Sequence, residues 1–289
     1  MGKAVARLLD DYSLEATAKD IDALEQAAPA LRPGTLVSVP WLPAETMAAR
    51  CAAAVAIRRL GFTPVPHIAA RRVKSRQALQ DFLARCTGEA RVDHLLVIAG
   101  DSAEPEGPYR DALAVIESGL LADHGIAAVT VSGHPEGHPA IGREALMRAL
   151  QDKSAALGAQ GMDCRIATQF AFDADAILRW LAEIRAAGIG HPVRIGVPGP
   201  ASIKALLRFA ALCGVEASTK VLAKYGLSLT RLIGTAGPDR LVDALEARLD
   251  GDVHGLVQAH FYPFGGIGRT VQWAVQWAAA RQSAAETAA

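Results

Sequence analysis

Three side chains that can exchange protons or hydrogen bonds with a ligand lie in or beside apolar runs of this 289-residue sequence. Glu15 and Asp101 each lie at the end of such a run, and Gln169 lies inside another. A carboxyl group can act as a general acid or base. Because a buried carboxylate or amide costs free energy unless it is paired or used, we expect a site where these residues converge. Each also has an ordinary interpretation, as a solvated acid, a turn residue or a structural hydrogen-bonding group.

A second group of polar side chains accompanies later apolar runs. It comprises His67 in 63–69, His134, Glu136 and His138 after 126–133, and His260 and Tyr262 in 254–264. The two histidines of "GHPEGHP" could suggest metal ligands, but Pro135 and Gly137 prevent the helical presentation that such a spacing needs, and the sequence offers no obvious third ligand. We therefore predict a rigid loop there and no metal.

The elements that must position these residues alternate regularly along the chain. Eight β-rich runs are expected at 12–17, 35–41, 63–69, 93–101, 126–133, 164–172, 192–199 and 254–264, with helices between them at 44–61, 75–86, 109–121 and 173–188 among others. Near-continuous apolar strands are typical of a sheet covered on both faces. Eight such units predict a single α/β domain, a TIM-type (β/α)8 barrel, whose chemistry lies at the carboxyl ends of the strands. A doubly wound sheet would also alternate, but its Gly-rich loop usually follows the first strand.

Composition narrows the class of protein. Lys plus Arg and Asp plus Glu both total 30, which gives no electrostatic reason to expect a nucleic-acid partner. The four cysteines form no CxxC pair and are expected to be reduced thiols. We find no signal peptide and no apolar run of about 18 residues, so we expect a cytoplasmic protein without a membrane span. A single domain should cover residues 1–289, with a frayed tail at roughly 282–289. The sequence leaves open whether the protein forms a homo-oligomer.

Five segments, in this order and spacing, resemble the methylenetetrahydrofolate reductase family. They are "AGDSAEPEGPY" (99–109), "SGHPEGHPAIG" (132–142), "IATQFAFD" (166–173), "IGVPGPAS" (195–202) and "QAHFY" (258–262), and the resemblance runs from about residue 13 to the end of the last expected strand at 264. It implies a flavin-containing barrel in which a nicotinamide cofactor reduces FAD. The flavin then passes hydride to 5,10-methylenetetrahydrofolate, which gives 5-methyltetrahydrofolate.

The resemblance also implies roles for individual residues. Glu15, in "SLEAT", matches the catalytic glutamate, a general acid that helps to open the imidazolidine ring of the substrate. Asp101 and Gln169 match residues that contact the pterin, whose alternating donors and acceptors suit a carboxylate beside an amide. Further contacts with the cofactor are implied for His67, Gly100, Asp101, Tyr109, His134, Glu136 and His138.

Three positions depart from the family pattern, and all belong to its flavin site. Ala99 replaces an arginine, Pro40 replaces a threonine, and His134 replaces a tyrosine. The cofactors expected are therefore NAD(P)H, with FAD either retained as in the family or absent. Without FAD, the nicotinamide would give hydride directly to the folate.

The segment "HFYPFGGIGRT" (260–270) contains a G-G-x-G pattern after the last expected strand. A dinucleotide-binding fingerprint should follow the first strand and lead to an acidic residue about 20 positions later. We instead expect a loop at the barrel rim, in which Gly265, Gly266 and Arg269 hold the pyrophosphate of a dinucleotide or the glutamate tail of folate, or a plain turn into the following helix.

Two other functions stay open on sequence alone. A non-redox barrel that binds folate or transfers a methyl group would keep the pterin residues but would not need Glu15 as an acid. An unrelated barrel aldolase or lyase would commonly need a lysine on a strand or a metal triad, and the expected strands contain no lysine.

Overall fold

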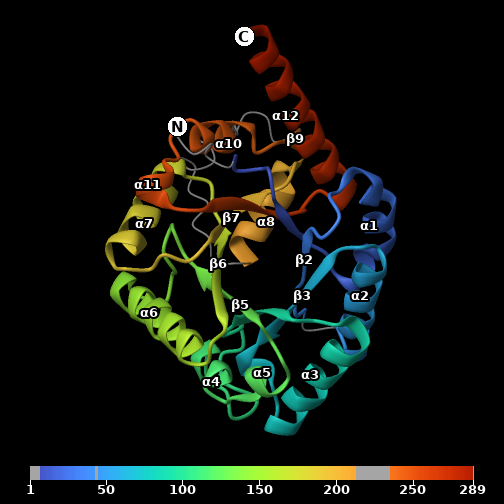
Figure 1. Ribbon diagram of the computed structural model, residues 1–289, viewed down its shortest axis with the longest axis vertical. Coiled ribbons are helices and arrows are strands. Elements are labelled where there is room, and N and C mark those ends of the chain that lie inside the picture. The colour runs from blue at the N-terminus through green and yellow to red at the C-terminus, as the bar shows by residue number, and fades with distance from the viewer. Residues whose placement is uncertain (1–6, 43–44, 213–234, 289) are drawn as a thin grey trace.

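A closed barrel of parallel strands organises the chain, as the sequence predicts (Figure 1). The computed structural model describes residues 7–42, 45–212 and 235–288. Around the barrel the strands run β1 (Ser13–Glu15), β2 (Leu36–Val39), β3 (Thr63–Ala69), β4 (His94–Ile98), β5 (Ala128–Gly133), β6 (Asp163–Phe170), β7 (Val193–Pro198) and β10 (Val257–Tyr262), and β10 pairs again with β1. Because all eight are parallel, their carboxyl ends share one mouth.

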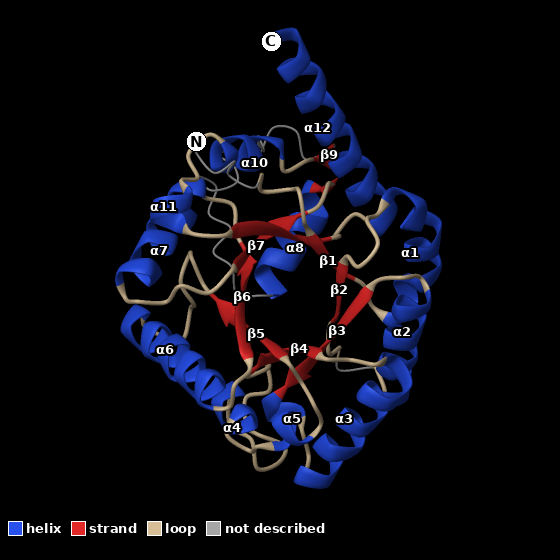
Figure 2. Cartoon of the chain, in the orientation of Figure 1, coloured by secondary structure: helices blue, strands red, loops and turns tan. Residues whose placement is uncertain are grey.

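Helices surround the barrel on the outside, except the helix at Ile203–Leu212, which overlies the ring of strands in this view (Figure 2). They are α1 (Ile21–Ala27), α2 (Met47–Arg59), α3 (Arg76–Ala90), α4 (Ala112–Ile116), α5 (Leu120–Asp123), α6 (Arg143–Ala159), α7 (Ala174–Ala186), α8 (Ile203–Leu212), α10 (Asp239–Glu246), α11 (Gly251–His254) and α12 (Ile267–Ala288), with 3-10 turns η1 (Ala18–Asp20), η2 (Ala28–Ala30) and η3 (Ala70–Arg72). None of the helices in this part of the chain combines the length and apolar character that a bilayer crossing requires.

Alternation along each strand decides what faces the barrel interior. Leu14 is completely buried in the main apolar cluster, whereas its neighbours Ser13 and Glu15 are polar. A small separate cluster of Val65, Leu96 and Ala167 collects residues from β3, β4 and β6. Since successive side chains point to opposite faces of a sheet, Glu15 lies on the face of β1 opposite Leu14, and His67 lies on the same face of β3 as Val65 of the small cluster.

Helix ends follow their local sequence signals. The predicted N-cap of α7, Asp173, accepts a hydrogen bond from the backbone N–H of Asp175 at 2.9 Å. The prediction of one helix over 109–121 is wrong, because Gly119 adopts φ +75° and separates α4 from α5. Left-handed backbone of this kind ends a helix and is readily adopted only by glycine.

The connection after β7 carries extra elements that the sequence did not predict. A short antiparallel pair, β8 (Ala201–Ser202) with β9 (Thr235–Ala236), flanks α8. In projection α8 overlies the middle of the ring of strands (Figure 2). Its Phe209 stacks on Phe264, beyond the end of β10, with ring centroids 4.1 Å apart. Part of the barrel mouth is therefore bordered by α8. The expected frayed tail stays a prediction, since the side chains of 282–289 lie outside the described residues.

Candidate functional site

Glu15 lies at the carboxyl end of β1 with an imidazole on either side. Its Oε1 is 3.8 Å from Nε2 of His67 on β3 and 3.9 Å from Nε2 of His260 on β10. The Glu15 side chain is 18% exposed, against 8% for His67 and 2% for His260. The three residues come from strands far apart in sequence, so barrel closure brings them together. The site therefore has a partly accessible carboxyl group between two buried rings.

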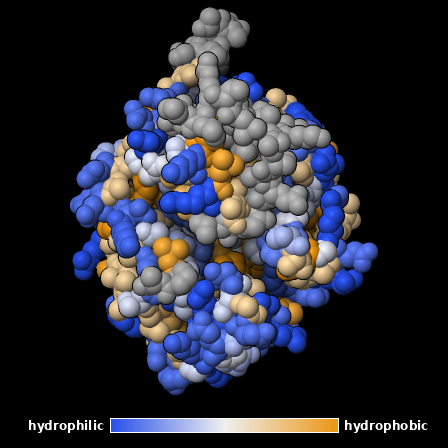
Figure 3. Space-filling view, turned by 180° about the vertical axis from the view of Figure 1, so that it is seen from behind, coloured by the Kyte–Doolittle hydropathy of each residue, from blue (hydrophilic) through white to orange (hydrophobic). Residues whose placement is uncertain are grey.

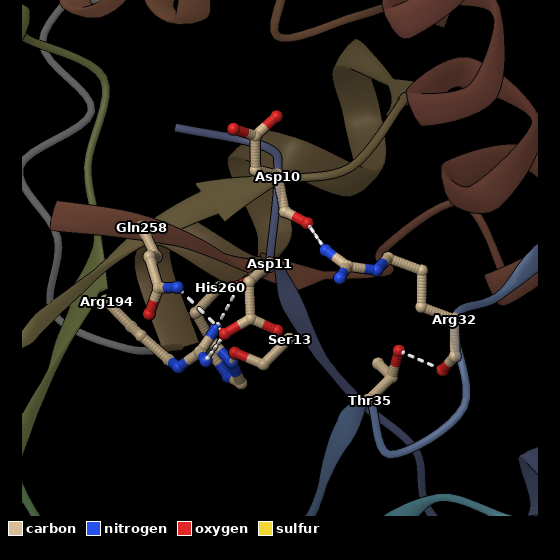
Figure 4. A network of polar contacts seen from close by, with 8 residues as sticks. All are labelled: Asp10, Asp11, Ser13, Arg32, Thr35, Arg194, Gln258 and His260. Atoms are coloured by element: carbon tan, nitrogen blue, oxygen red, sulfur yellow. Dashed lines mark hydrogen bonds and ion pairs between the residues drawn. The ribbon is translucent and has the colours of Figure 1, made fainter. Parts of the chain in front are cut away.

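Backbone and hydroxyl contacts fix the two histidines. Ser13 Oγ lies 2.8 Å from Nδ1 of His260 on the adjacent strand (Figure 4). The backbone oxygen of His67 accepts a hydrogen bond from Arg50 on α2 at 3.2 Å. Among the described residues, neither Nε2 has a hydrogen-bond partner. Two unsatisfied ring nitrogens beside one carboxylate are expensive to bury, which is typical of groups that await a ligand.

Burial keeps the ring of His67 neutral. It lowers the pKa of His67 from 6.5 to about 4, and it outweighs the attraction of Glu15, which raises that pKa, while the nearby His260 and Arg50 lower it further. A neutral imidazole can donate from one nitrogen and accept at the other. At neutral pH, His67 can therefore exchange a hydrogen bond with Glu15 or with a ligand without adding charge.

A polar network joins the start of β1 to two other strands. The guanidinium of Arg194 on β7 donates to the backbone oxygen of Asp11 at 2.5 Å and to its carboxylate at 2.8 Å. Gln258 on β10 donates to the same carboxylate at 2.8 Å (Figure 4). These bonds tie the start of β1 to β7 and β10, so Glu15 projects from a strand that is braced below it.

Gln169 lies on the opposite side of the mouth, at an irregularity in β6. The pairing register with β7 shifts between Ala167 and Phe170, and the Gln169 side-chain oxygen accepts the backbone N–H of Phe170 at 3.0 Å. Gln169 lines a cavity of about 320 Å³, shared with the loop after β5. Its half-buried position and local hydrogen bond fit the structural interpretation, and the cavity fits the ligand interpretation.

Aromatic rings pack together at the carboxyl ends of β6 and β10. The Phe170 ring makes edge contacts with Tyr262 at 5.4 Å and Phe264 at 5.0 Å, measured between centroids. Tyr262 also lies 5.1 Å from the ring of His260 and donates its hydroxyl to the backbone oxygen of Thr168. This aromatic group begins beside His260, so a flat ligand near Glu15 would meet it.

The loop after β5 is braced by its own acid. Oε1 of Glu136 accepts the backbone N–H groups of Phe172 and Asp173, both at 2.8 Å, at the start of α7. The rings of His134 and His138 pack edge to face with centroids 5.5 Å apart. Burial lowers the pKa of His134 to about 4, helped by His138 and Lys153. No group of three or more possible metal ligands occurs in the described ranges. Glu136 thus has a contact with the backbone that the sequence did not indicate.

Two cavities flank this loop. The 320 Å³ cavity lies on the side of Gln169, and a second, of about 250 Å³, reaches from His134 to Trp180 on α7. Both are lined by His134 and Arg143, and Arg143 pairs with Glu183 at 2.6 Å. Neither cavity is lined by Glu15, so Glu15 lies outside both of them.

Asp101 is held at the rim by an arginine that the sequence did not single out. Arg72, in η3, approaches its carboxylate at 2.8 Å, and the side chain of Asp101 is 74% exposed. Arg72 also lies 3.7 Å from Glu106. Ala99 occupies the position where the family pattern has an arginine, and a cation from the neighbouring loop pairs with the aspartate here. The two adjacent arginines at 71–72 were the feature of the sequence that could have indicated a cationic partner for Asp101.

The remaining predicted contacts differ in accessibility. Gly100 has φ +90° and packs closely on Ala69, so its loop turns sharply over the end of β3. Tyr109 is 5% exposed. Gly265 is packed against Pro200 so closely that a Cβ would overlap the carbonyl oxygen, whereas Gly266 has φ +102° and open space. Arg269 lies in the first turn of α12 and is exposed. Ligand roles for these residues stay predictions.

Seen from behind, on the face opposite to that in Figure 1, the molecule has apolar surface near its middle and polar residues towards the edge (Figure 3).

Comparisons with known proteins agree with this architecture. The sequence profile of the family described as methylenetetrahydrofolate reductase matches residues 17–262. A 5,10-methylenetetrahydrofolate reductase from Pectobacterium carotovorum subsp. carotovorum is 30% identical over 162 residues, which cover 55% of this chain and 51% of that protein. The chain thus aligns with about half the length of this curated relative.

Solved structures share the fold at low identity. A protein from Clostridium thermocellum, described as binding two copies of 5-methyl-5,6,7,8-tetrahydrofolic acid, superposes with a TM-score of 0.64 at 9% identity, over 93% of this chain and 94% of that one. Dihydropteroate synthase from Thermus thermophilus gives a TM-score of 0.50 at 17% identity, over 96% and 95%. At such identities the likeness establishes the barrel fold alone.

Proposed function

This chain belongs to the methylenetetrahydrofolate reductase family, and from this premise we propose that it interconverts 5,10-methylenetetrahydrofolate and 5-methyltetrahydrofolate with a nicotinamide cofactor, directly or through a flavin. The observation that carries the proposal is the position of Glu15 between the unpartnered Nε2 atoms of His67 and His260. A folate-binding protein without chemistry would gain nothing from a carboxyl group at this point, since an unpaired acid costs binding free energy.

Glu15 acts as the general acid. In the reductive direction its proton goes to the ring nitrogen that leaves when the imidazolidine opens, and the methylene carbon becomes an electrophilic iminium on the other nitrogen. Hydride then reaches that carbon and completes the methyl group. One proton and one hydride are consumed, and NAD(P)H becomes NAD(P)+. The neutral ring of His67, whose pKa burial lowers to about 4, adds no competing positive charge. A positioned acid of this kind accelerates such a step by about 100- to 10,000-fold.

The aromatic group and Gln169 are suited to hold the pterin. Tyr262 offers a ring surface beside His260 and is backed by the buried ring of Phe170, and the Gln169 amide can both donate and accept. Asp101 would complete the hydrogen bonds to the pterin. Because its exposed carboxylate pairs with Arg72 at the rim, it has to turn inward, or the substrate has to extend to it.

The loop after β5 fits a dinucleotide in its donor chemistry. His134, His138 and Arg143 line a cavity of about 320 Å³ beside Gln169 and offer imidazole and guanidinium donors to phosphate and ribose oxygens. A dinucleotide bound here would supply the hydride. The same donors would serve NAD(P)H or FAD, so the choice between direct transfer and a flavin depends on which of them the protein retains.

Two measurements test the proposal. Purified protein should oxidise NADH or NADPH in the presence of 5,10-methylenetetrahydrofolate, and the assay is repeated with added FAD. The visible spectrum of the purified protein shows whether a flavin is bound. Oxidation that needs neither bound nor added flavin supports direct transfer.

Glu15→Gln supplies the decisive variant, because it keeps the shape of the side chain and removes the acid. Turnover should fall by about 100-fold or more, while folate binding measured by calorimetry stays close to that of the wild type. Glu106→Gln, at an exposed acid of the rim, is the control and should keep its rate. Full activity in Glu15→Gln would refute the assigned role, and folate binding without turnover in the wild type would favour a binding or methyl-transfer protein.

A further inference from the structure

A buried arginine lies directly behind the site. Arg50 projects from α2 and is 1% exposed, whereas arginine side chains are almost never fully buried unless they are paired. No carboxylate in the described part of the chain forms an ion pair with it within 4.0 Å. Its guanidinium carbon instead lies 3.6 Å from the ring centroid of Trp41 and 4.7 Å from that of Phe82. The cation is thus in contact with two aromatic rings.

The guanidinium of Arg50 has a polar contact with a residue of the site. Arg50 donates to the backbone oxygen of His67 at 3.2 Å, while its Nε is buried and has no partner among the described residues. Burial lowers the pKa of Arg50 to about 10, and the nearby Cys51, Cys86 and Glu45 oppose that shift. The group therefore stays charged at neutral pH, and the positive charge is fixed behind β3.

We propose that Arg50 is a positioning residue, which holds the His67 segment of β3 in place and keeps a positive charge behind the ring that faces Glu15. Stacking on Trp41 and Phe82 fixes the plane of the guanidinium, so the hydrogen bond to the His67 oxygen has one direction. The ring of His67 is thereby presented with Nε2 towards Glu15.

The charges around His67 make the two parts of this role separable. Glu15 from β1 favours the protonated ring, and His260 from β10 and Arg50 from α2 disfavour it. Removing the charge of Arg50 while keeping a hydrogen-bond donor should therefore make His67 easier to protonate. Keeping the charge while changing the head group should leave His67 neutral and disturb only its position.

Arg50→Gln and Arg50→Lys test these two parts. In unliganded protein with labelled histidines, the pKa of each ring is followed by NMR, and the His67 signal is assigned with His67→Gln. We expect Arg50→Gln to raise the pKa of His67 by a fraction of a unit, because burial remains the largest cause of its low value. Arg50→Lys should leave that pKa unchanged but lower kcat in the folate assay about 10-fold, because an ammonium cannot stack as a plane.

Arg185→Gln is the matched control for structural effects. Arg185 on α7 also donates to backbone oxygens, those of Ile189, His191 and His254, but outside the barrel. Its loss should lower the melting temperature without moving the pKa of His67. A His67 titration in Arg50→Gln that matches the wild type would overturn the proposal.

The test can still be decided if one of the variants does not fold. If Arg50→Gln does not fold, Arg50→Lys decides: an unchanged kcat would refute the positioning role, and a lowered kcat with a neutral His67 supports it. The inference rests on the proposed function only in this kinetic readout. If the wild type shows no turnover with any nicotinamide and folate, the proposed function fails, and the NMR titration still decides the role of Arg50.

Discussion

Acid should destabilise this fold through His67. Its ring has a pKa of about 4 in the folded chain because it is buried, against 6.5 for an ordinary histidine. Between these values the unfolded chain binds a proton that the folded chain does not, so stability is complete above about pH 6.5 and falls as the pH drops. A shift of about 2.5 units corresponds to roughly 3.4 kcal/mol once the pH is below both values. At pH 5 the loss from this one group is about 2 kcal/mol relative to pH 8.

His67→Gln removes the titrating ring and with it this part of the pH dependence. Urea unfolding at about pH 8 and pH 5 should show a loss of stability that is about 2 kcal/mol smaller in the variant than in the wild type. Val65→Ala, on the same strand and 2% exposed, is the control. It should lower stability at both pH values equally, by about 1–3 kcal/mol, because no proton is involved. Equal losses in His67→Gln and the wild type would refute the reasoning.

Other predictions concern the rim. Gly265→Ala places a Cβ against the Pro200 oxygen and should destabilise the protein by about 3 kcal/mol, whereas Gly266→Ala, which has open space but φ +102°, should cost about 1 kcal/mol; chemical unfolding separates the two. Arg72→Met releases Asp101 from its ion pair, and since exposed pairs add little stability, the melting temperature should hold. Folate affinity should change in Arg72→Met if Asp101 contacts the pterin, and unchanged calorimetric titrations would remove Asp101 from the site.

Several features of the fold could be predicted from local sequence because they depend on local physics. The strand at 63–69 has the predicted bounds, and Asp173 caps α7 as expected. Continuous apolar strands separated by amphipathic helices leave few arrangements that cover both sheet faces. The predicted helix boundaries were wrong where a single residue takes a left-handed backbone conformation, as Gly119 does between α4 and α5.

The contacts of the predicted site residues were less accessible to sequence reasoning. The cofactor contact expected of Glu136 stays a prediction, and the structure adds that its carboxylate accepts the backbone N–H groups of Phe172 and Asp173 just before α7. The partner of Asp101 is Arg72, on the preceding loop. Such contacts join residues about 30 positions apart, and local patterns carry no information on which of two nearby loops supplies the partner.

The sequence by itself determined the barrel, the family resemblance and the choice of Glu15, because strand periodicity and motif spacing are properties of the chain. Only the tertiary structure decided what surrounds Glu15. Closure of the barrel brings the last strand beside the first, so that Nε2 of His260 lies 3.9 Å from Oε1 of Glu15. The packing of α2 on β3 lets Arg50 donate to the backbone oxygen of His67. Distances between strands depend on the register and closure of the whole sheet, which no single segment encodes.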